Sequence, residues 1–337
     1  IVWKRELSHI NGRTQTRGAA VIKKIGAQYD QAIRSGTKVN LPVLAYYATG
    51  RLFEEARKSK EKPTKNPEIA SRLRAYRECL NAKMTFKQFI KWFRGKALAQ
   101  IQKKEEDISY TVVCQAIINN LPNCRNVYLE FDPDKPAGLK VVLEDESILP
   151  FTYLSDGTRN FFALMADIAY KCVTLNPHLR EAALQETAGI VLIDELDLHL
   201  HPEWQQKIMH GLKTTFPKVQ FVTTTHSPFL IQETEEGQLI KLEEGAVDVI
   251  GQGNNLSIED IIEGYQDMEN PQWGKTRQHM FEVAKSYYKA VKEDRDTPEL
   301  KKAFDEAMKP FAQDTALYAM IEQEKIKAAY LKSKEES

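Results

Sequence analysis

The spacing of apolar and polar residues predicts both helices and buried strands in the first half of the chain. Apolar positions recur at helical spacing over residues 1–40, which predicts an amphipathic helix. The apolar run from Leu41 to Tyr47 is instead typical of a buried strand. A helix is predicted over residues 110–121, followed by two strands over residues 127–131 and 139–143.

Hydrophobic runs in the second half predict a βαβ unit. The run from Gly189 to Ile193 is continuous and apolar, as in a strand buried on both faces, and residues 219–225 form a second such strand. Pro202 lies between them, where the first turn of a helix tolerates proline. A long apolar helix is predicted before this unit, from about Asn160 to Leu175. A hairpin and then several charged helices are predicted after it, over residues 238–250 and 257–337.

Charge is divided unevenly along the chain. The 47 Lys and Arg residues balance 47 Asp and Glu residues, so the formal net charge is zero. Residues 1–104, however, hold 24 basic and 7 acidic residues, whereas residues 105–337 hold 23 basic and 40 acidic ones. This segregation favours an anionic partner or a self-complementary assembly over an evenly mixed surface.

Two segments carry most of the segregated charge. Residues 51–104 contain 16 basic and 5 acidic residues, and four cations interleave with four aromatic residues: Lys87, Lys91, Arg94 and Lys96 with Phe86, Phe89, Trp92 and Phe93. Either this is a nucleic-acid surface, whose cations contact phosphates, or it is a solvated basic face over an aromatic core. Residues 233–269 contain 11 acidic residues and only Lys241 as a base, and could dock a partner subunit.

Composition limits the class of protein. Hydrophobic residues make up 42% and charged residues 28%, as in a folded globular protein. No apolar run approaches the roughly 20 residues that span a bilayer, and no signal segment is recognisable, so we expect a cytoplasmic protein without a membrane partner. The four cysteines form no CxxC pair and are expected to be buried free thiols. They are Cys79, Cys114, Cys124 and Cys172.

An acidic pair ends the first strand of the βαβ unit. Asp194 and Glu195 follow a buried apolar strand, where carboxylates are costly unless they meet a cation, hydrogen bonds or solvent. A Mg²⁺ ion held by Asp194, with Glu195 placed to polarise an attacking water, would use both charges and matches nucleotide hydrolysis. His226 follows the neighbouring strand and could reach a phosphate at the same sheet edge. An ordinary strand end with a structural histidine is the alternative.

A Ser-Asp-Gly sequence precedes the long apolar helix. Ser155 or Asp156 could simply cap the helix, which is the ordinary role of such residues. A helix amino terminus with a serine hydroxyl, and with Gly157 to let the backbone approach a ligand, is also a phosphate site.

Taken in order, these elements resemble the ATPase heads of the ABC superfamily, in the branch of RecF, SMC and OLD-like proteins. The string Asp194-Glu195-Leu196-Asp197-Leu198-His199-Leu200-His201-Pro202, followed by Thr223-Thr224-Thr225-His226-Ser227-Pro228, carries the resemblance. The family's motifs correspond to Leu154–Gly157 (signature), Gly189–Glu195 (Walker B), Asp197–Pro202 (D-loop) and His226 (switch histidine). The resemblance implies an α/β head, with a parallel or mixed sheet and flanking helices, a basic helical insertion and a C-terminal helical extension.

The resemblance also implies ATP and Mg²⁺ as cofactors. Asp194 would support Mg²⁺, Glu195 would position or activate water, and His226 would sense the γ-phosphate. Such heads work as dimers or higher oligomers, in which Ser155 and Gly157 grip the γ-phosphate bound in the opposite subunit. The residues implied to bind nucleotide are Ser155, Asp156, Gly157, Asp197 and His226.

Residues 41–51, the signature segment and the helical tail resemble more closely the ATPase subunit of Septu-type anti-phage systems, also found with some retrons. In that family the ATPase works with a separate HNH endonuclease subunit. The resemblance therefore implies an ATP-hydrolysing subunit of a defence complex. The implied domains are residues 1–50 and 108–250 for the head, 51–107 for the basic insertion and 251–337 for a helical extension that could dock a partner.

One essential motif is missing. No GxxxxGK[ST] sequence occurs, although a hydrolysing head needs that loop to cradle the phosphates. In Gly274-Lys275-Thr276 the first glycine of the motif is replaced by Glu269, so we expect a helix surface or loop there. Because the chain begins with Ile1, we expect the P-loop to lie upstream; the alternative is a degenerate head that binds no ATP in its own pocket.

Other functions stay open at this point. A non-hydrolysing scaffold that binds nucleic acid and assembles a nuclease is one alternative, and a RecF-like DNA repair ATPase is another. An OLD-type nuclease is disfavoured because no DxD-centred metal site is evident after Ile250. A zinc site at His199 and His201 is disfavoured because the D-loop placement explains both histidines better. A hydrolase triad of Ser155, His226 and Asp194 is disfavoured because no nucleophile-elbow sequence surrounds the serine.

Overall fold

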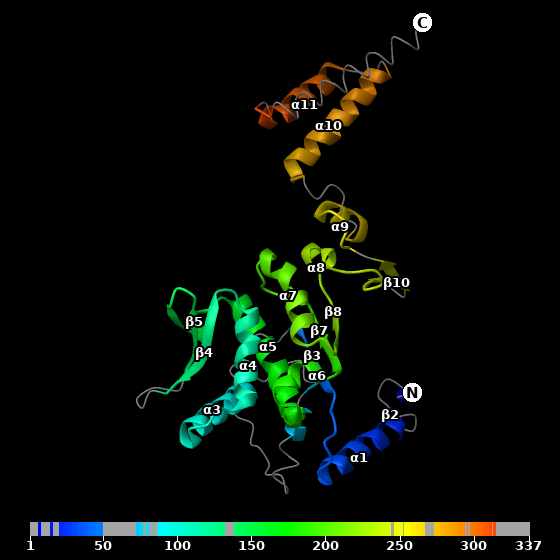
Figure 1. Ribbon diagram of the computed structural model, residues 1–337. Coiled ribbons are helices and arrows are strands. Elements are labelled where there is room, and N and C mark those ends of the chain that lie inside the picture. The colour runs from blue at the N-terminus through cyan, green and yellow to red at the C-terminus, as the bar shows by residue number, and fades with distance from the viewer. Residues whose placement is uncertain are drawn as a thin grey trace. The chain divides into compact units, whose positions relative to one another are not determined.

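The computed structural model divides into two compact units, Ile1–Thr234 and Glu235–Ser337 (Figure 1). The residues that it describes are 6–7, 14–15, 20–49, 72–76, 79–80, 86–131, 138–243, 246–251, 253–266, 273–293, 295, 297–311 and 313–314. Most of the segment between residues 50 and 85, which includes much of the predicted basic insertion, therefore lies outside the described residues.

A three-stranded parallel sheet lies at the centre of the first unit. Its order is β3 (Val43–Tyr47), β7 (Gly189–Ile193) and β8 (Val219–Thr223). Helix α7 (Pro202–Thr215) connects β7 to β8, so the predicted βαβ unit is confirmed. In register, Tyr47, Ile193 and Thr223 lie side by side, which brings the carboxyl ends of all three strands to one edge.

Helix α5 (Asp156–Leu175) forms the core of this unit. Sixteen of its twenty residues are buried, and a helix that is buried on all sides must be enclosed by other elements. It packs against β3, against α3 (Phe86–Lys103) and against α4 (Ile108–Asn120), as Figure 1 shows. The predicted α/β fold, a parallel sheet with flanking helices, is confirmed.

A separate antiparallel sheet precedes α5. The predicted strand pair is present as β4 (Cys124–Glu130) and β5 (Gly138–Leu143), and a short third strand, β6 (Ile148–Pro150), pairs with β5. The remaining short elements of this unit are η3 (Arg74–Tyr76), η4 (Phe151–Tyr153), η5 (Pro177–Ala182), α6 (Ala183–Glu186) and α8 (Pro228–Gln232).

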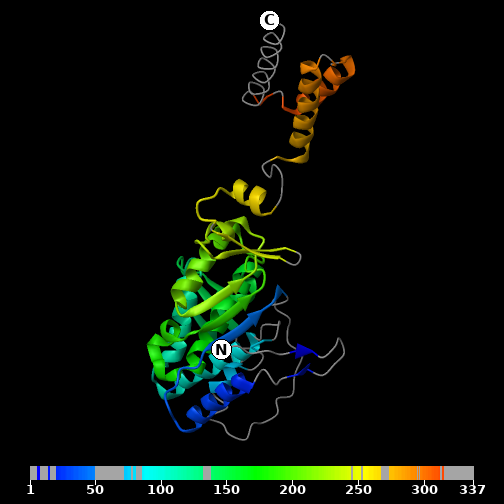
Figure 2. The same cartoon turned by 90° about the vertical axis from the view of Figure 1, so that its right-hand side faces the viewer.

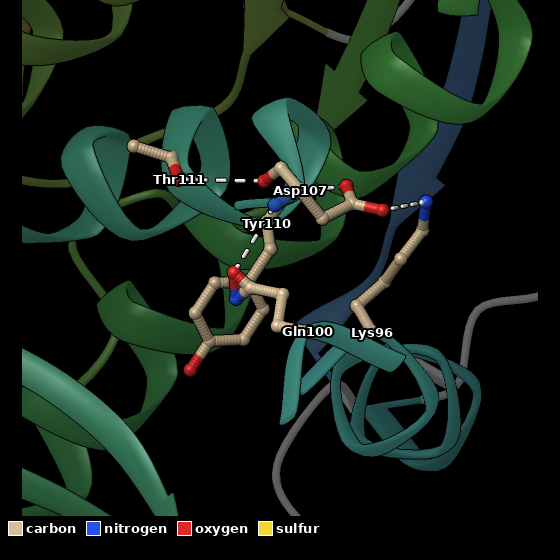
Figure 3. Close-up of polar contacts among 5 residues, drawn as sticks. All are labelled: Lys96, Gln100, Asp107, Tyr110 and Thr111. Carbon is tan, nitrogen blue, oxygen red and sulfur yellow. Dashed lines mark hydrogen bonds and ion pairs between the residues drawn. The ribbon is translucent and has the colours of Figure 1, made fainter. Parts of the chain in front are cut away.

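The junction of α3 and α4 shows how the described part of the basic segment is used (Figure 3). Asp107 caps α4 by accepting from the Tyr110 amide at 3.2 Å, and it pairs with Lys96 Nζ at 2.7 Å. The Asp107 amide in turn donates to Gln100 Oε1 at 3.2 Å. The aromatic residues of α3 point inward: Phe89 and Phe93 are fully buried, and Phe93 stacks on Tyr110. The described residues thus favour a basic face over an aromatic core.

The amino-terminal segment differs from the prediction. The continuous helix predicted over residues 1–40 is wrong, because β1 (Glu6–Leu7) pairs antiparallel with β2 (Thr14–Gln15) and α1 begins only at Ala20 and ends at Arg34. The sequence between the two strands contains Asn11-Gly12, a dipeptide that favours hairpins over helix.

The second unit contains a hairpin and helices. Strands β9 (Leu239–Glu243) and β10 (Ala246–Gly251) pair antiparallel, as predicted. Helices α10 and α11 share a small core around Met280, Ala284 and Met308. Gly274 is the N-cap of α10, as expected for a helix start and not a phosphate loop. The helical elements are α9 (Ile258–Tyr265), α10 (Lys275–Lys292), α11 (Pro298–Met308) and η6 (Lys309–Phe311).

The two faces of the central sheet have different surroundings. The face toward α5 is buried: its residues Val43, Ala45, Tyr47, Val191 and Ile193 are at most 3% exposed. The other face, which we call the open face, includes the apolar residues Leu44, Ile190, Leu192 and Val222, exposed by 39, 44, 39 and 50%. In Figure 2 the three strands turn this face toward the viewer.

The described residues also include all four cysteines. All four cysteines are free thiols; Cys114, Cys124 and Cys172 are buried, and Cys79 is half-buried. Burial raises the pKa of the Cys172 thiol to about 12, so it stays protonated at neutral pH. Within the described ranges, no helix is both long and apolar enough to cross a bilayer.

Candidate functional site

The predicted site residues gather at the carboxyl edge of the central sheet. Asp194 directly follows β7, and its amide donates to the carbonyl of Tyr47, the last residue of β3, at 2.7 Å. On the other side, the Thr224 amide donates to the Ile193 carbonyl at 3.0 Å, and the Leu196 amide donates to the Thr224 carbonyl at 3.0 Å. The pairing of the sheet therefore continues into the residues that carry the acidic side chains.

The hydroxyl of Thr224 holds both acidic residues. It donates to Asp194 Oδ1 at 2.5 Å and accepts from the Glu195 amide at 2.9 Å. One side chain from the end of β8 thus orients the carboxylate of Asp194 and the backbone of Glu195. His226 lies two residues further along the same segment, with its side chain exposed to solvent.

Thr225 makes a parallel connection to the D-loop. Its hydroxyl donates to Asp197 Oδ1 and accepts from the Ser227 amide at 2.9 Å. The D-loop itself is closed by the Leu198 amide donating to the Glu195 carbonyl at 3.0 Å, and by a similar bond from Leu200 to Asp197. The edge strand and the D-loop are thereby joined at two successive threonines.

One residue just before the D-loop and one within it adopt left-handed backbone conformations. Glu195 has φ of 46° and His199 has φ of 61°. Such conformations cost non-glycine residues about 1–3 kcal/mol each, and they persist only where the surrounding contacts enforce them. Here the hydrogen bonds from Thr224 and within the D-loop provide that enforcement, and the strain falls on a residue predicted to be catalytic.

The start of α5 packs directly on the D-loop. A Cβ atom at Gly157 would lie 2.1 Å from the His199 carbonyl oxygen, so only glycine fits there. Ser155 is the N-cap of α5, and its hydroxyl accepts from the Thr158 amide at 3.2 Å. Asp156 is exposed and forms an ion pair with Arg159. The structure therefore brings the Ser-Asp-Gly segment beside the D-loop of the same chain.

Sequence reasoning missed several residues that build this site. Besides Thr224 and Thr225, Gln205 of α7 donates to the Leu200 carbonyl at 2.9 Å and accepts from the Ser227 hydroxyl at 2.7 Å. His201 caps α7, its Nδ1 accepting from the Glu203 amide. The sequence signal that could have found the two threonines is the run Thr223-Thr224-Thr225 at the end of a buried strand. Hydroxyl side chains at that position do not fill the core and are free to bind polar groups of the site.

The donor set fits one half of a nucleotide site. Mg²⁺ is usually bound by one or two protein carboxylates together with phosphate oxygens and water, and Asp194 and Glu195 offer such carboxylates in half-exposed positions. The described edge supplies acidic and hydroxyl groups, but the sequence contains no Gly-rich Lys-bearing loop for the phosphates. The residues present therefore fit the metal and the attacking water better than the phosphate chain.

Relatives with assigned names resemble the chain in sequence. The Retron Ec83 probable ATPase of Escherichia coli is 28% identical over 285 residues, which cover 66% of this chain and 51% of the relative. The Septu protein PtuA of Bacillus thuringiensis is 30% identical over 156 residues, which cover 43% of this chain and 38% of that protein. The chain thus spans about half the length, or less, of these curated relatives.

Solved structures show a fainter likeness. A structure from work on ATP-driven dimerization and DNA-stimulated activation of SMC ATPases covers 56% of this chain and all of the solved chain, at 13% identity and a TM-score of 0.34.

A family of protein domains matches residues 45–232, which is more than half of the chain. The family is described as "AAA domain, putative AbiEii toxin, Type IV TA system". The matched range begins within β3, ends with α8 and includes every site residue described above. With the named relatives, it confirms the predicted kinship with the ABC-type ATPases of retron and Septu defence systems. This chain therefore belongs to that AAA-domain family.

Proposed function

We propose that this chain is the catalytic head of an ATP-hydrolysing defence protein, which converts ATP and water to ADP and phosphate. The observation that carries the proposal is the hydrogen-bonded edge in which Thr224 holds Asp194 and Glu195 and Thr225 holds Asp197. Membership of the AAA-domain family and kinship with a protein named as a probable retron ATPase support it.

Each residue has a role in this proposal that matches its position. Asp194, oriented by Thr224, holds Mg²⁺, which when bound neutralises charge on the phosphates. Glu195 positions the attacking water and accepts its proton. His226, exposed beyond β8, contacts the γ-phosphate. Ser155, Asp156 and Gly157 at the start of α5, with Asp197 of the D-loop, face the nucleotide of a second head.

The proposal requires a phosphate-binding loop that residues 1–337 do not contain. We propose that it is supplied by further sequence of the same protein. The open face of the sheet supports this idea, because parallel sheets are almost always covered on both faces. A head that binds no ATP in its own pocket is the competing possibility.

We further propose the assembly in which this head works. The heads form a homodimer or higher oligomer in the cytoplasm, and the acidic stretch over residues 233–269 docks a separate HNH endonuclease subunit. The kinship with Septu PtuA supports this part of the proposal. ATP turnover would then regulate the nuclease. Nucleic acid remains a candidate partner, to be tested by salt-dependent binding to duplex DNA.

The test is the substitution Glu195→Gln in the full-length protein. Loss of the proton acceptor is expected to lower ATP turnover by about 10²–10⁴-fold while ATP binding and dimerisation persist. Turnover would be followed by phosphate release, and binding by equilibrium dialysis of labelled ATP. The matched control is Glu203→Gln, which changes an exposed glutamate of α7 that pairs with Lys207.

The result separates the proposal from its alternatives. Unchanged turnover in Glu195→Gln would remove Glu195 from the mechanism. A wild-type protein that assembles with a nuclease but releases no phosphate would be a non-hydrolysing scaffold. An ATPase that is stimulated by DNA and binds no nuclease would instead indicate a RecF-like repair function.

A further inference from the structure

A buried polar cluster lies between α5 and the central sheet, behind the described site. Tyr47, Asp167 and Lys171 are exposed by only 2, 3 and 8%. The Tyr47 hydroxyl donates to Asp167 Oδ2 at 2.7 Å, and Lys171 Nζ forms an ion pair with the same oxygen. Lys171 Nζ also lies 5.9 Å from the centroid of the Tyr47 ring. The Tyr47 hydroxyl and the Lys171 ammonium therefore converge on the carboxylate of Asp167.

The cost of this cluster suggests a role beyond stability. Taking a lysine and an aspartate out of water costs several kcal/mol per ion, and well-packed apolar residues in their place are often equally or more stabilising. The cluster nonetheless has a defined geometry, because the carboxylate of Asp167 meets both Lys171 on its own helix and Tyr47, the last residue of β3. Burial, and then the charge of Asp167, raises the pKa of the Tyr47 phenol, so the hydroxyl stays available as a donor.

The cluster leads directly to the candidate site. The carbonyl of Tyr47 accepts from the Asp194 amide at 2.7 Å, so the residue whose hydroxyl donates to Asp167 also holds the start of the acidic pair. At its other end α5 carries the Ser155 cap, and Gly157 packs on the D-loop. Helix α5 thus contacts the site twice: at its start through Gly157, and in its middle through Asp167 and Tyr47.

We propose that Tyr47, Asp167 and Lys171 are positioning residues, which fix Asp194 relative to α5 by fastening the end of β3 to the middle of that helix. A movement of the Ser-Asp-Gly segment at the start of α5 is transmitted through the same contact to the carboxylate of Asp194. The catalytic part of this inference rests on the proposed function; the structural part does not.

The first experiment measures amide hydrogen exchange at Asp194 in the full-length protein. Tyr47→Phe removes only the hydroxyl that bonds to Asp167, and is expected to speed exchange of the Asp194 amide about fivefold or more, as local opening becomes easier. The matched control is Tyr46→Phe, the same change on the opposite face of the same strand, where exchange at Asp194 is expected to stay as in the wild type. Equal exchange in the two variants would overturn the structural part.

The second experiment replaces the whole cluster by apolar residues, Tyr47→Phe with Asp167→Leu and Lys171→Met. The melting temperature is expected to be retained, because the buried pair is replaced and no buried donor is left without an acceptor. The KM for ATP should stay within about twofold and kcat should fall about tenfold, since misplacing a catalytic group slows the chemical step. A purely structural role predicts unchanged kcat in this folded variant, and that outcome would overturn the catalytic part.

The two proposals fail in different ways. Absence of ATP turnover in the wild type would contradict the proposed function and, with it, the catalytic part of the inference. The exchange comparison of Tyr47→Phe with Tyr46→Phe needs no turnover, and so decides the structural part in either case.

Discussion

The two faces of the central parallel sheet carry side chains of similar apolar character but have different surroundings. On the face toward α5, residues such as Val191 and Ile193 are completely enclosed. On the open face, their neighbours Ile190 and Leu192 are 44 and 39% exposed. Because alternate residues of one strand differ this much, the contrast arises from what covers each face and not from the strands themselves.

The contrast helps to interpret the continuous apolar sequence of β7. A continuous apolar run is typical of a strand buried on both faces, whereas a strand with one solvated face usually alternates apolar and polar residues. β7 has the first pattern, but the described residues cover only one of its faces. The pattern of β7 is therefore typical of a strand with a second covering layer, and the site at its carboxyl end borders the face that the described residues leave exposed.

The largest effect is expected on the covered face. Ile193→Ala removes a side chain that is 1% exposed and leaves a cavity against α5, which is expected to lower the free energy of unfolding by about 2–5 kcal/mol. Urea denaturation monitored by tryptophan fluorescence would measure it. A loss of unfolding free energy below about 1 kcal/mol would mean that a side chain on the enclosed face stabilises the fold no more than one on an exposed face.

A smaller effect is expected where Gly189 of β7 lies against Val43 of β3. A Cβ atom at Gly189 would lie 2.0 Å from the Val43 carbonyl oxygen, so Gly189→Ala forces the two strands apart at their first paired residues. Overpacking of this kind costs about 1–3 kcal/mol. Gly264→Ala in α9, where an added Cβ atom would meet no neighbouring part of the described structure within 4 Å, is the matched control and should not destabilise the protein. A Gly189→Ala variant as stable as the control would contradict the contact.

Much of the head could be predicted because its signals are local. The apolar run of β7, Pro202 at the start of α7 and the next run at β8 each depend on a few adjacent residues, and the βαβ rule then places Asp194 and His226 at one edge. Ser155 was open to either a capping or a phosphate role, and the structure shows the cap.

The contacts between distant segments could not be predicted. The bond from Thr224 to Asp194 joins residues 30 apart, and that from Tyr47 to Asp167 joins residues 120 apart; neither leaves a periodic trace in the sequence. Gly157 was predicted to let the backbone approach a ligand, but nothing in the sequence indicated that it also makes room for the His199 carbonyl. At the amino terminus, helical spacing outweighed the turn signal of Asn11-Gly12, and the prediction was wrong.

The smallest effect is expected on the open face, and it tests the comparison most directly. Leu192→Ala deletes the same kind of side chain as Ile193→Ala, one residue away, but at 39% exposure much less apolar area returns to water. The 337-residue chain is therefore expected to lose less than about 1 kcal/mol in the same urea titration. A loss as large as that of Ile193→Ala would show that the face is covered in solution. If that loss grew with protein concentration, the covering layer would be a second copy of the chain; if it did not, the layer would come from the chain itself.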